Sequence, residues 1–259
     1  MKFPEKELTN ILIDLKENYC AAALKVEFET EAIANDEILM LKKISELAGL
    51  DFIVKIGGCG AVKDLFDVMA LGANIIVAPM IETSYALEKF VCTVNSVFPP
   101  EECSNLKLFI NIETKQGFYN LDDIFNSEYL SLISGIVVGR SDLAKSLGFG
   151  TDDINGDEIL EYTNQALSYA IKYKKEFIVG GNISSASLPF LNKISQKGLT
   201  KFETRKIVFN ADLLKDEAST KAGIIKAIDF ELLWLENCIR PDEKRFNLLQ
   251  ERQNIEKHT

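Results

Sequence analysis

The feature that most constrains the fold of this chain is an alternation of short apolar runs with longer segments of helical period. The runs are rich in β-branched residues and lie at 22–28, 52–56, 74–78, 107–112, 135–138, 176–179 and 205–209. Helical patterns lie between them, at about 34–48, 60–71, 84–95, 119–127, 156–173 and 186–197, with a longer one within 211–237. Nearly continuous apolar strands separated by helices are typical of a parallel sheet covered on both faces. Because no Pro/Gly/Ser-rich linker interrupts the series, we expect one domain at 1–239 and a charged tail at 240–259.

Two α/β architectures fit this order. A doubly wound sheet usually carries a glycine-rich first turn, but the first run ends in Glu-Phe-Glu-Thr-Glu and the chain contains no GxGxxG motif. A (β/α)8 TIM barrel needs about 250 residues and places chemistry at the carboxyl ends of its strands. The sequence therefore favours an α/β fold of the TIM-barrel type. Since only seven strands are convincing, the barrel is either irregular or has a further strand hidden, with 1–20 as one place for it.

Charge and composition exclude several classes of protein. The chain has 39 acidic and 29 basic residues, a net charge of −10, which argues against nucleic-acid binding and against adhesion to anionic membranes. No apolar run is long enough to span a bilayer, the first residues lack the apolar core of a signal peptide, and five scattered cysteines suit a reducing compartment. We therefore expect a cytoplasmic protein. The single histidine, His258, lies in the tail, which argues against histidine-based catalysis and metal binding.

Two carboxylates follow neighbouring predicted strands. Glu113 comes directly after the run at 107–112, and Asp142 follows the run at 135–138 in a Gly-Arg-Ser-Asp-Leu segment. Carboxylates from adjacent strand ends can share a hard divalent cation, with water and substrate completing the coordination. Each residue also has a structural explanation, since Glu113 could cap the helix that follows it and Asp142 is in a typical N-cap context. Spacing alone leaves both interpretations open.

These two stretches, with Val-Ala-Pro-Met-Ile-Glu-Thr at 77–83, resemble the HpcH/HpaI family of pyruvate-dependent class II aldolases and citrate lyase β-subunits. The similarity is continuous from about 52 to 148 and looser onward to about 214. The resemblance implies a TIM barrel, a Mg²⁺ or Mn²⁺ ion (or another divalent cation) held by Glu113 and Asp142, and a bound 2-oxo acid or its enolate. Backbone amides around Ser141 and Asp142 would hold the substrate carboxylate at a helix N-terminus. Exchange of the last helix between subunits in this family implies a homo-oligomer.

Lys55 and Asn111 are candidates for substrate contacts. Lys55 stands where the aldolases that this chain resembles usually have an arginine that contacts the enolate, and a lysine supplies the charge without the bidentate fork. Its alternative is a strand-end lysine that reaches solvent. Asn111 lies two residues before Glu113 and so faces the same way, although a buried structural asparagine is an equal alternative.

The first predicted strand carries the main departure from the family pattern. Relatives have a histidine at this strand end that handles a proton, whereas this chain has no histidine at this position. Lys25, Glu27 and Glu29 share one strand face because strand side chains alternate, so Glu27 or Glu29 is the candidate proton carrier. The alternative is an edge strand with a solvated face.

Three further features suggest contacts away from the metal. Arg140 stands where many relatives carry a small residue or proline, and a cation facing the pocket would suit a second anionic group of the substrate. The loop at 180–185, with Gly181, could meet that group or a sugar hydroxyl, or could be an ordinary helix cap. Glu203 and Arg205 share a strand face that we place towards the amino end of the barrel, as an internal ion pair.

The resemblance therefore predicts a metal-dependent carbon–carbon lyase, an aldolase that acts on a 2-oxo acid such as pyruvate through its enolate. The acceptor would be a small-molecule aldehyde, sugar-derived or phosphorylated. The alternatives are a citrate-lyase, malyl-thioester or phosphoenolpyruvate type of enzyme, or a catalytically silent relative that binds metal and a small acid.

Overall fold

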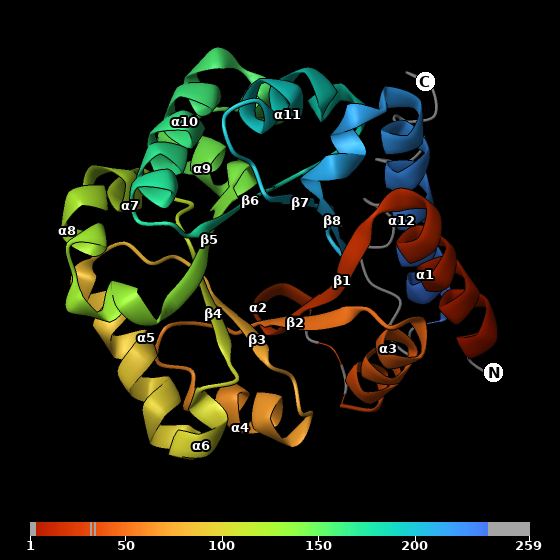
Figure 1. Ribbon diagram of the computed structural model, residues 1–259, viewed down its shortest axis with the longest axis horizontal. Coiled ribbons are helices and arrows are strands. Elements are labelled where there is room, and N and C mark those ends of the chain that lie inside the picture. The colour runs from red at the N-terminus through yellow and green to blue at the C-terminus, as the bar shows by residue number, and fades with distance from the viewer. Residues whose placement is uncertain (1–3, 32, 34, 238–259) are drawn as a thin grey trace.

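The computed structural model describes residues 4–31, 33 and 35–237, and its eight strands form a closed barrel in chain order (Figure 1). The strands are β1 (Ala21–Glu27), β2 (Asp51–Lys55), β3 (Ile75–Ala78), β4 (Lys107–Asn111), β5 (Ile133–Gly139), β6 (Glu176–Gly180), β7 (Lys201–Glu203) and β8 (Ile207–Asn210). Neighbouring strands from β1 to β7 are parallel. The predicted barrel is confirmed.

Helices surround the barrel on the outside (Figure 1). They are α1 (Glu5–Tyr19), α2 (Phe28–Glu31), α3 (Asn35–Ala48), α4 (Val62–Ala70), α5 (Ser84–Val97), α6 (Pro100–Cys103), α7 (Lys115–Tyr119), α8 (Leu121–Phe125), α9 (Arg140–Leu147), α10 (Asp157–Lys172), α11 (Leu188–Ser195) and α12 (Glu217–Asn237). Helices α1 and α12 pack side by side, joined by an ion pair between Asp14 and Lys226. Of the helices described, none combines the length and apolar character that crossing a bilayer requires. The predicted tail at 240–259 lies outside the described residues.

The irregularity of the barrel lies at its last two strands. Strand β8 runs antiparallel to both β7 and β1, and β7 connects to it through a turn at 204–206 instead of a helix. The strand that the sequence analysis overlooked is therefore β7, which at three residues is too short to show a period. The alternative place for it, within 1–20, is wrong, because Leu8, Leu12 and Leu15 are buried at helical spacing along α1.

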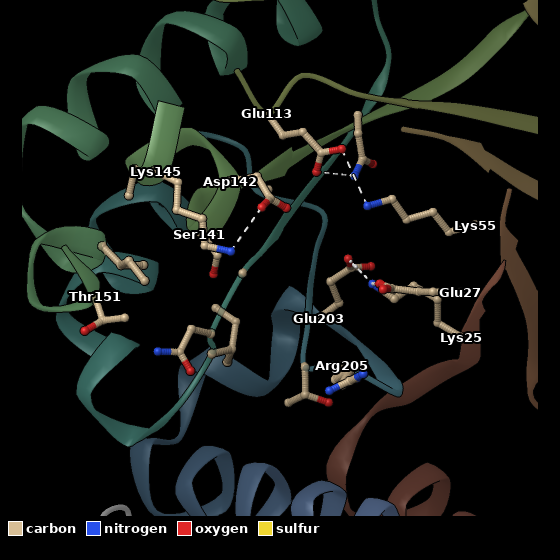
Figure 2. Close-up of a pocket in the computed structure, with 18 of the residues that line it drawn as sticks. Lys25, Glu27, Lys55, Glu113, Ser141, Asp142, Lys145, Thr151, Glu203 and Arg205 are labelled. Carbon is tan, nitrogen blue, oxygen red and sulfur yellow. Dashed lines mark hydrogen bonds and ion pairs between the residues drawn. The ribbon is translucent and has the colours of Figure 1, made fainter. Parts of the chain in front are cut away.

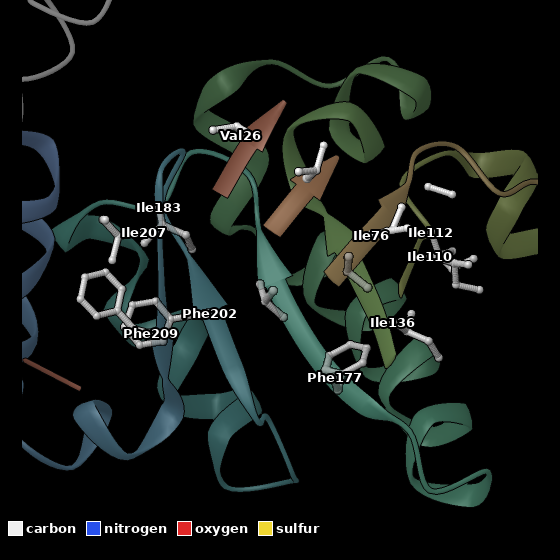
Figure 3. Close-up of a cluster of buried hydrophobic side chains, with 14 of the residues drawn as sticks. Val26, Ile76, Ile110, Ile112, Ile136, Phe177, Ile183, Phe202, Ile207 and Phe209 are labelled. Carbon is white, nitrogen blue, oxygen red and sulfur yellow. The ribbon is translucent and has the colours of Figure 1, made fainter. Parts of the chain in front are cut away.

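The outer faces of the strands form the main hydrophobic core under the helices (Figure 3). Outward-facing strand residues such as Val26, Ile76, Ile136 and Phe177 are completely buried there. Each buried aliphatic side chain of this size contributes about 1.5–3 kcal/mol to folding through removal from water. This packing fixes the strand ends that carry the polar residues described below.

The lumen of the barrel contains two layers of different character. An apolar lumen layer fills its middle and is separate from the outer core; it consists of Ala23, Ile53, Ile75, Val77, Phe109, Val137, Ile178 and Val208. Since strand side chains alternate, the residues two positions further along the parallel strands face the same lumen. They form a polar lumen layer near the carboxyl ends of the strands; it consists of Lys25, Lys55, Asn111, Gly139 and Gly180. The sequence thus places the polar side chains of Lys25, Lys55 and Asn111 directly above the apolar lumen layer.

Candidate functional site

A pocket of about 660 Å³ opens above the polar lumen layer, at the carboxyl ends of the parallel strands (Figure 2). Its lining includes seven of the predicted site residues, namely Glu27, Lys55, Asn111, Glu113, Ser141, Asp142 and Gly181. The strand ends have therefore brought together residues that lie up to 154 positions apart in the chain, from Glu27 to Gly181. Arg140 does not line this pocket.

Glu113 follows β4 and is almost completely buried in the pocket wall. Its Oε2 accepts a hydrogen bond from Asn111 Nδ2 at 2.8 Å, and its Oε1 accepts one from the Met80 backbone amide at 3.1 Å. The Lys55 Nζ lies 3.5 Å from Oε1. The next helix, α7, is capped by Thr114, so the alternative role of Glu113 as a helix cap is wrong.

Burial raises the pKa of the Glu113 carboxyl above its ordinary value. The charge of Asp142 acts in the same direction. Lys55 and the hydrogen bonds from Asn111 and Met80 lower the pKa but do not cancel the effect of burial. The negative charge at Glu113 is therefore only partly compensated by the protein.

Asp142 lies in the first turn of α9, whose N-cap is Gly139. Its side chain is 41% exposed and lies 3.4 Å from Lys145 Nζ. The alternative explanation of Asp142 as an N-cap is wrong, and the carboxylate is accessible from the pocket. Lys55 is buried and contacts Glu113, so the alternative of a lysine that reaches solvent is also wrong.

A buried amide oxygen fits a cation beside these carboxylates. Asn111 Oδ1 is buried and accepts no hydrogen bond within the described part of the chain. Glu113, Asp142 and this oxygen form a set of hard oxygen donors, the type that Mg²⁺ and Mn²⁺ prefer. Among the described residues, no group of three or more His, Cys, Asp or Glu side chains is arranged to hold a metal, so water or substrate would complete the coordination. The residues fit a weakly held, partly hydrated divalent cation.

A second charged cluster lies across the pocket, around Lys25 (Figure 2). The Lys25 Nζ lies 2.6 Å from Glu203 Oε1 and 3.0 Å from Glu27 Oε1. Burial by itself lowers the pKa of Lys25, but the charges of Glu203 and Glu27 outweigh burial and raise it above the usual lysine value. Lys25 therefore stays cationic and does not act as a neutral amine nucleophile.

Two predictions about charged residues are wrong. Strand β1 ends at Glu27 and α2 begins at Phe28, so Glu29 does not share the strand face of Lys25; its side chain lies outside what the structure describes. Glu203 and Arg205 do not pair with each other at the amino end. Both line the pocket at the carboxyl end, because β7 runs parallel to β6 and its turn into β8 lies there.

Arg140 corrects a third prediction, since its side chain turns away from the pocket. The guanidinium is buried and donates hydrogen bonds to the carbonyls of Gly180 and Gly181 at 3.1 and 2.7 Å, and to Asn155 Oδ1 at 2.7 Å. It also lies over the Phe190 ring. Burial lowers the pKa of Arg140 to about 9, and none of its partners within the described ranges is a carboxylate. Arg140 holds the loop after β6 in place.

The loop that Arg140 holds packs tightly on the N-terminus of α9. Gly181 has a φ of +85°, and a Cβ there would lie 2.5 Å from the Ser141 backbone nitrogen. Only glycine therefore allows this close approach with this backbone conformation. The approach places Gly181 and Ser141 together on the pocket wall.

A comparison with family models identifies residues 35–179 as HpcH/HpaI aldolase/citrate lyase. The chain belongs to this family. Membership supports an activity of the lyase or aldolase type. A comparison with curated proteins finds no match.

Several solved structures share the fold of this chain at low sequence identity. The citrate synthase SbnG is 18% identical with a TM-score of 0.60, over 76% of this chain and 81% of that one. An HpcH/HpaI aldolase from Desulfitobacterium hafniense DCB-2 is 14% identical with a TM-score of 0.61, over 76% and 81%. An HpcH/HpaI aldolase/citrate lyase family protein from Burkholderia cenocepacia J2315 is 13% identical with a TM-score of 0.61, over 85% and 90%. At these identities the likeness supports the barrel fold alone.

Glu203 is the pocket residue whose position sequence reasoning missed. The signal was present, because Lys-Phe-Glu alternates polar and apolar residues, but three residues are too few to assign a strand direction. Its acidic side chain lines the pocket together with those of Glu27, Glu113 and Asp142.

Proposed function

We propose that this HpcH/HpaI protein is a divalent-metal-dependent carbon–carbon lyase that acts on a 2-oxo acid such as pyruvate through its enolate. One observation carries the proposal: Glu113 and Asp142 line a single pocket with a buried lysine and a buried, unbonded amide oxygen. A carboxylate pair that the protein compensates only partly is a favourable place for Mg²⁺ or Mn²⁺. Such a cation, when bound, would polarise the carboxylate and 2-oxo group of the substrate as a Lewis acid.

The other side chains have roles that follow from their positions. Lys55 supplies a fixed positive charge 3.5 Å from Glu113, where the oxyanion of an enolate would need stabilisation. The backbone amides of Ser141 and Asp142, in the first turn of α9, are suited to the substrate carboxylate. Arg140 contributes indirectly, because it fixes the loop that holds Gly181 against this turn.

The remaining volume of the pocket suits a second reactant. A cavity of about 660 Å³ is larger than a three-carbon acid needs, and its outer part is lined by Phe149, Thr151 and Asn182. An aldehyde with hydroxyl groups would find both an apolar wall and hydrogen-bonding partners there. The identity of this acceptor and assembly into a homo-oligomer stay predictions.

Deuterium exchange into pyruvate tests the proposal directly. With Mg²⁺ or Mn²⁺ in deuterated buffer, the protein should remove the pyruvate methyl signal in proton NMR faster than the metal alone. A chelator and Glu113→Ala should each abolish the excess rate. Glu176→Ala is the matched control, because Glu176 pairs with Lys201 near the opposite end of the barrel. No excess exchange in the wild-type protein would contradict the proposal.

A second candidate is a relative that binds a metal and a small acid without turning it over. The observation that favours it is that none of the described residues lining the pocket is a histidine. Wild-type protein that binds Mn²⁺ and pyruvate but exchanges no deuterium would support this candidate.

A further inference from the structure

Glu113 and Glu203 lie at the same level, over the carboxyl ends of β5 and β6. Gly139 and Gly180 are register partners on these two parallel strands. A Cβ on Gly139 would lie 2.4 Å from Glu113 Oε2, and a Cβ on Gly180 would lie 2.8 Å from Glu203 Oε1. Each glutamate therefore lies over one glycine of the pair, and adjacent strands are about 4.8 Å apart. The two glycines form a floor without side chains between Glu113 and Glu203.

Glu203 is fixed through one oxygen and leaves the other unused. Its Oε1 accepts the hydrogen bond from Lys25 Nζ, while its Oε2 accepts none from the residues that the structure describes. Glu203 lines the pocket, and Figure 2 shows it directed from its strand towards the space below Glu113 and Lys55. Lys25 thus orients a carboxylate in the lining of the pocket through one oxygen and leaves the second oxygen available to a substrate.

Glu27 is the other carboxylate on Lys25, and its surroundings differ. The charge of Glu27 also helps to raise the pKa of Arg205, so Glu27 lies in the field of two cations. Glu27 has no counterpart to the glycine floor that places Glu203 beside Glu113. Glu203 is therefore the better placed of the two to take a proton.

We propose that Glu203 is the catalytic base of this pocket and that Lys25 is its positioning residue, an inference that rests on the proposed function. Glu203 Oε2 removes a proton from C3 of the bound 2-oxo acid. The C–H electron pair forms the C2=C3 double bond, and the carbonyl electrons move to O2, which gives the enolate. When C3 bonds to the carbonyl carbon of an aldehyde, the protonated Glu203 returns the proton to the aldehyde oxygen. Cleavage follows the same steps in reverse.

Two reactions distinguish the role of the catalytic base from the roles of the other site residues. Pyruvate deuterium exchange requires removal of a proton from carbon, whereas decarboxylation of oxaloacetate produces the same enolate by loss of CO₂. With Mn²⁺ present, Glu203→Gln should lower exchange by at least about 100-fold, the usual contribution of a positioned base, and leave decarboxylation at the wild-type rate. Glu113→Gln should lose both reactions. Glu176→Gln, which affects a glutamate–lysine pair near the amino ends of β6 and β7, is the control and should lose neither.

Lys25 variants test positioning. Lys25→Met should lower kcat for exchange while decarboxylation continues, and Lys25→Arg should restore part of the exchange rate because it keeps the charge. Decarboxylation also shows that each variant is folded. A structural role for Lys25 would lower both reactions together.

The remaining outcomes of these experiments each contradict either the inference or the proposed function. Glu203→Gln with wild-type exchange, or with loss of both reactions, would overturn the inference. Wild-type protein that decarboxylates oxaloacetate without exchanging pyruvate would overturn the role of Glu203 and leave the metal-binding side of the proposed function standing. Wild-type protein that does neither would overturn the proposed function, and the inference with it.

Discussion

Glu113 and Glu203 are both buried glutamates at the ends of parallel strands, and both lie over a glycine of the same pair, yet their charges are compensated differently. Lys55 lies 3.5 Å from Glu113, and burial leaves the pKa of Glu113 raised. Lys25 lies 2.6 Å from Glu203 and is itself held in the cationic form. The first glutamate has capacity for an added cation, while the second already has its own. Two glutamates in one pocket can therefore have different roles, depending on the cation beside each of them.

The largest expected effect concerns stability on the Lys25 side. Lys25→Met leaves the buried carboxylate of Glu203 and the partly buried carboxylate of Glu27 without their lysine, and loss of one partner from a buried ion pair typically costs about 3–5 kcal/mol. Lys55→Met should cost less, because Glu113 keeps its hydrogen bonds from Asn111 and Met80. The free energy of unfolding in urea measures both. Equal losses in the two variants would remove the difference between the two sides.

Adding Glu203→Gln to Lys25→Met provides the control for that experiment. The double variant removes the negative charge of Glu203 that Lys25→Met leaves without its lysine, so it should be more stable than Lys25→Met alone. If it is less stable, the cost of Lys25→Met comes from packing and not from charge.

The glycine floor gives an intermediate effect. Gly139→Ala should displace Glu113 and weaken Mn²⁺ binding by about tenfold or more, as loss of correct ligand orientation does elsewhere. Gly180→Ala is the matched variant, which should displace Glu203 and leave Mn²⁺ binding unchanged. Isothermal titration with Mn²⁺ measures both affinities. A weaker affinity in both variants would mean that the two glutamates belong to one site.

The smallest effect is expected at the exposed ion pair of Lys145 with Asp142. The Lys145 side chain is 74% exposed, and pairs of this kind contribute at most about 1 kcal/mol. Lys145→Ala should therefore leave the midpoint of urea unfolding almost unchanged. A large loss of stability would show that the rim of the pocket supports the fold more than its exposure indicates.

The barrel could be predicted because β1 to β6 each form an apolar run between helices. The last two strands could not be placed correctly, since β7 has three residues and the reversal at 204–206 lacks a glycine or proline signal. This one omission put Glu203 at the wrong end of the barrel. Asn111 beside Glu113 was predictable, because strand alternation fixes which residues share a face.

The direction of Arg140 could not be read from its position after a strand. A guanidinium that follows a strand can face the pocket or the backbone behind it. Here it faces the backbone, because it donates hydrogen bonds to the carbonyls of Gly180 and Gly181. Those partners lie about 40 residues away in the chain and become visible only when β5 and β6 are placed side by side. The residue type predicts the positive charge of Arg140, but its hydrogen-bond partners can be identified only from the fold.

Binding of Mn²⁺, followed by electron paramagnetic resonance, tests the central claim that Glu113 and Asp142 hold a divalent cation and the Lys25 side does not. The wild-type protein should bind Mn²⁺, Glu113→Gln and Asp142→Asn should each lose most of this affinity, and Glu203→Gln should bind as the wild type does. Wild-type affinity in Glu113→Gln and Asp142→Asn would contradict the claim.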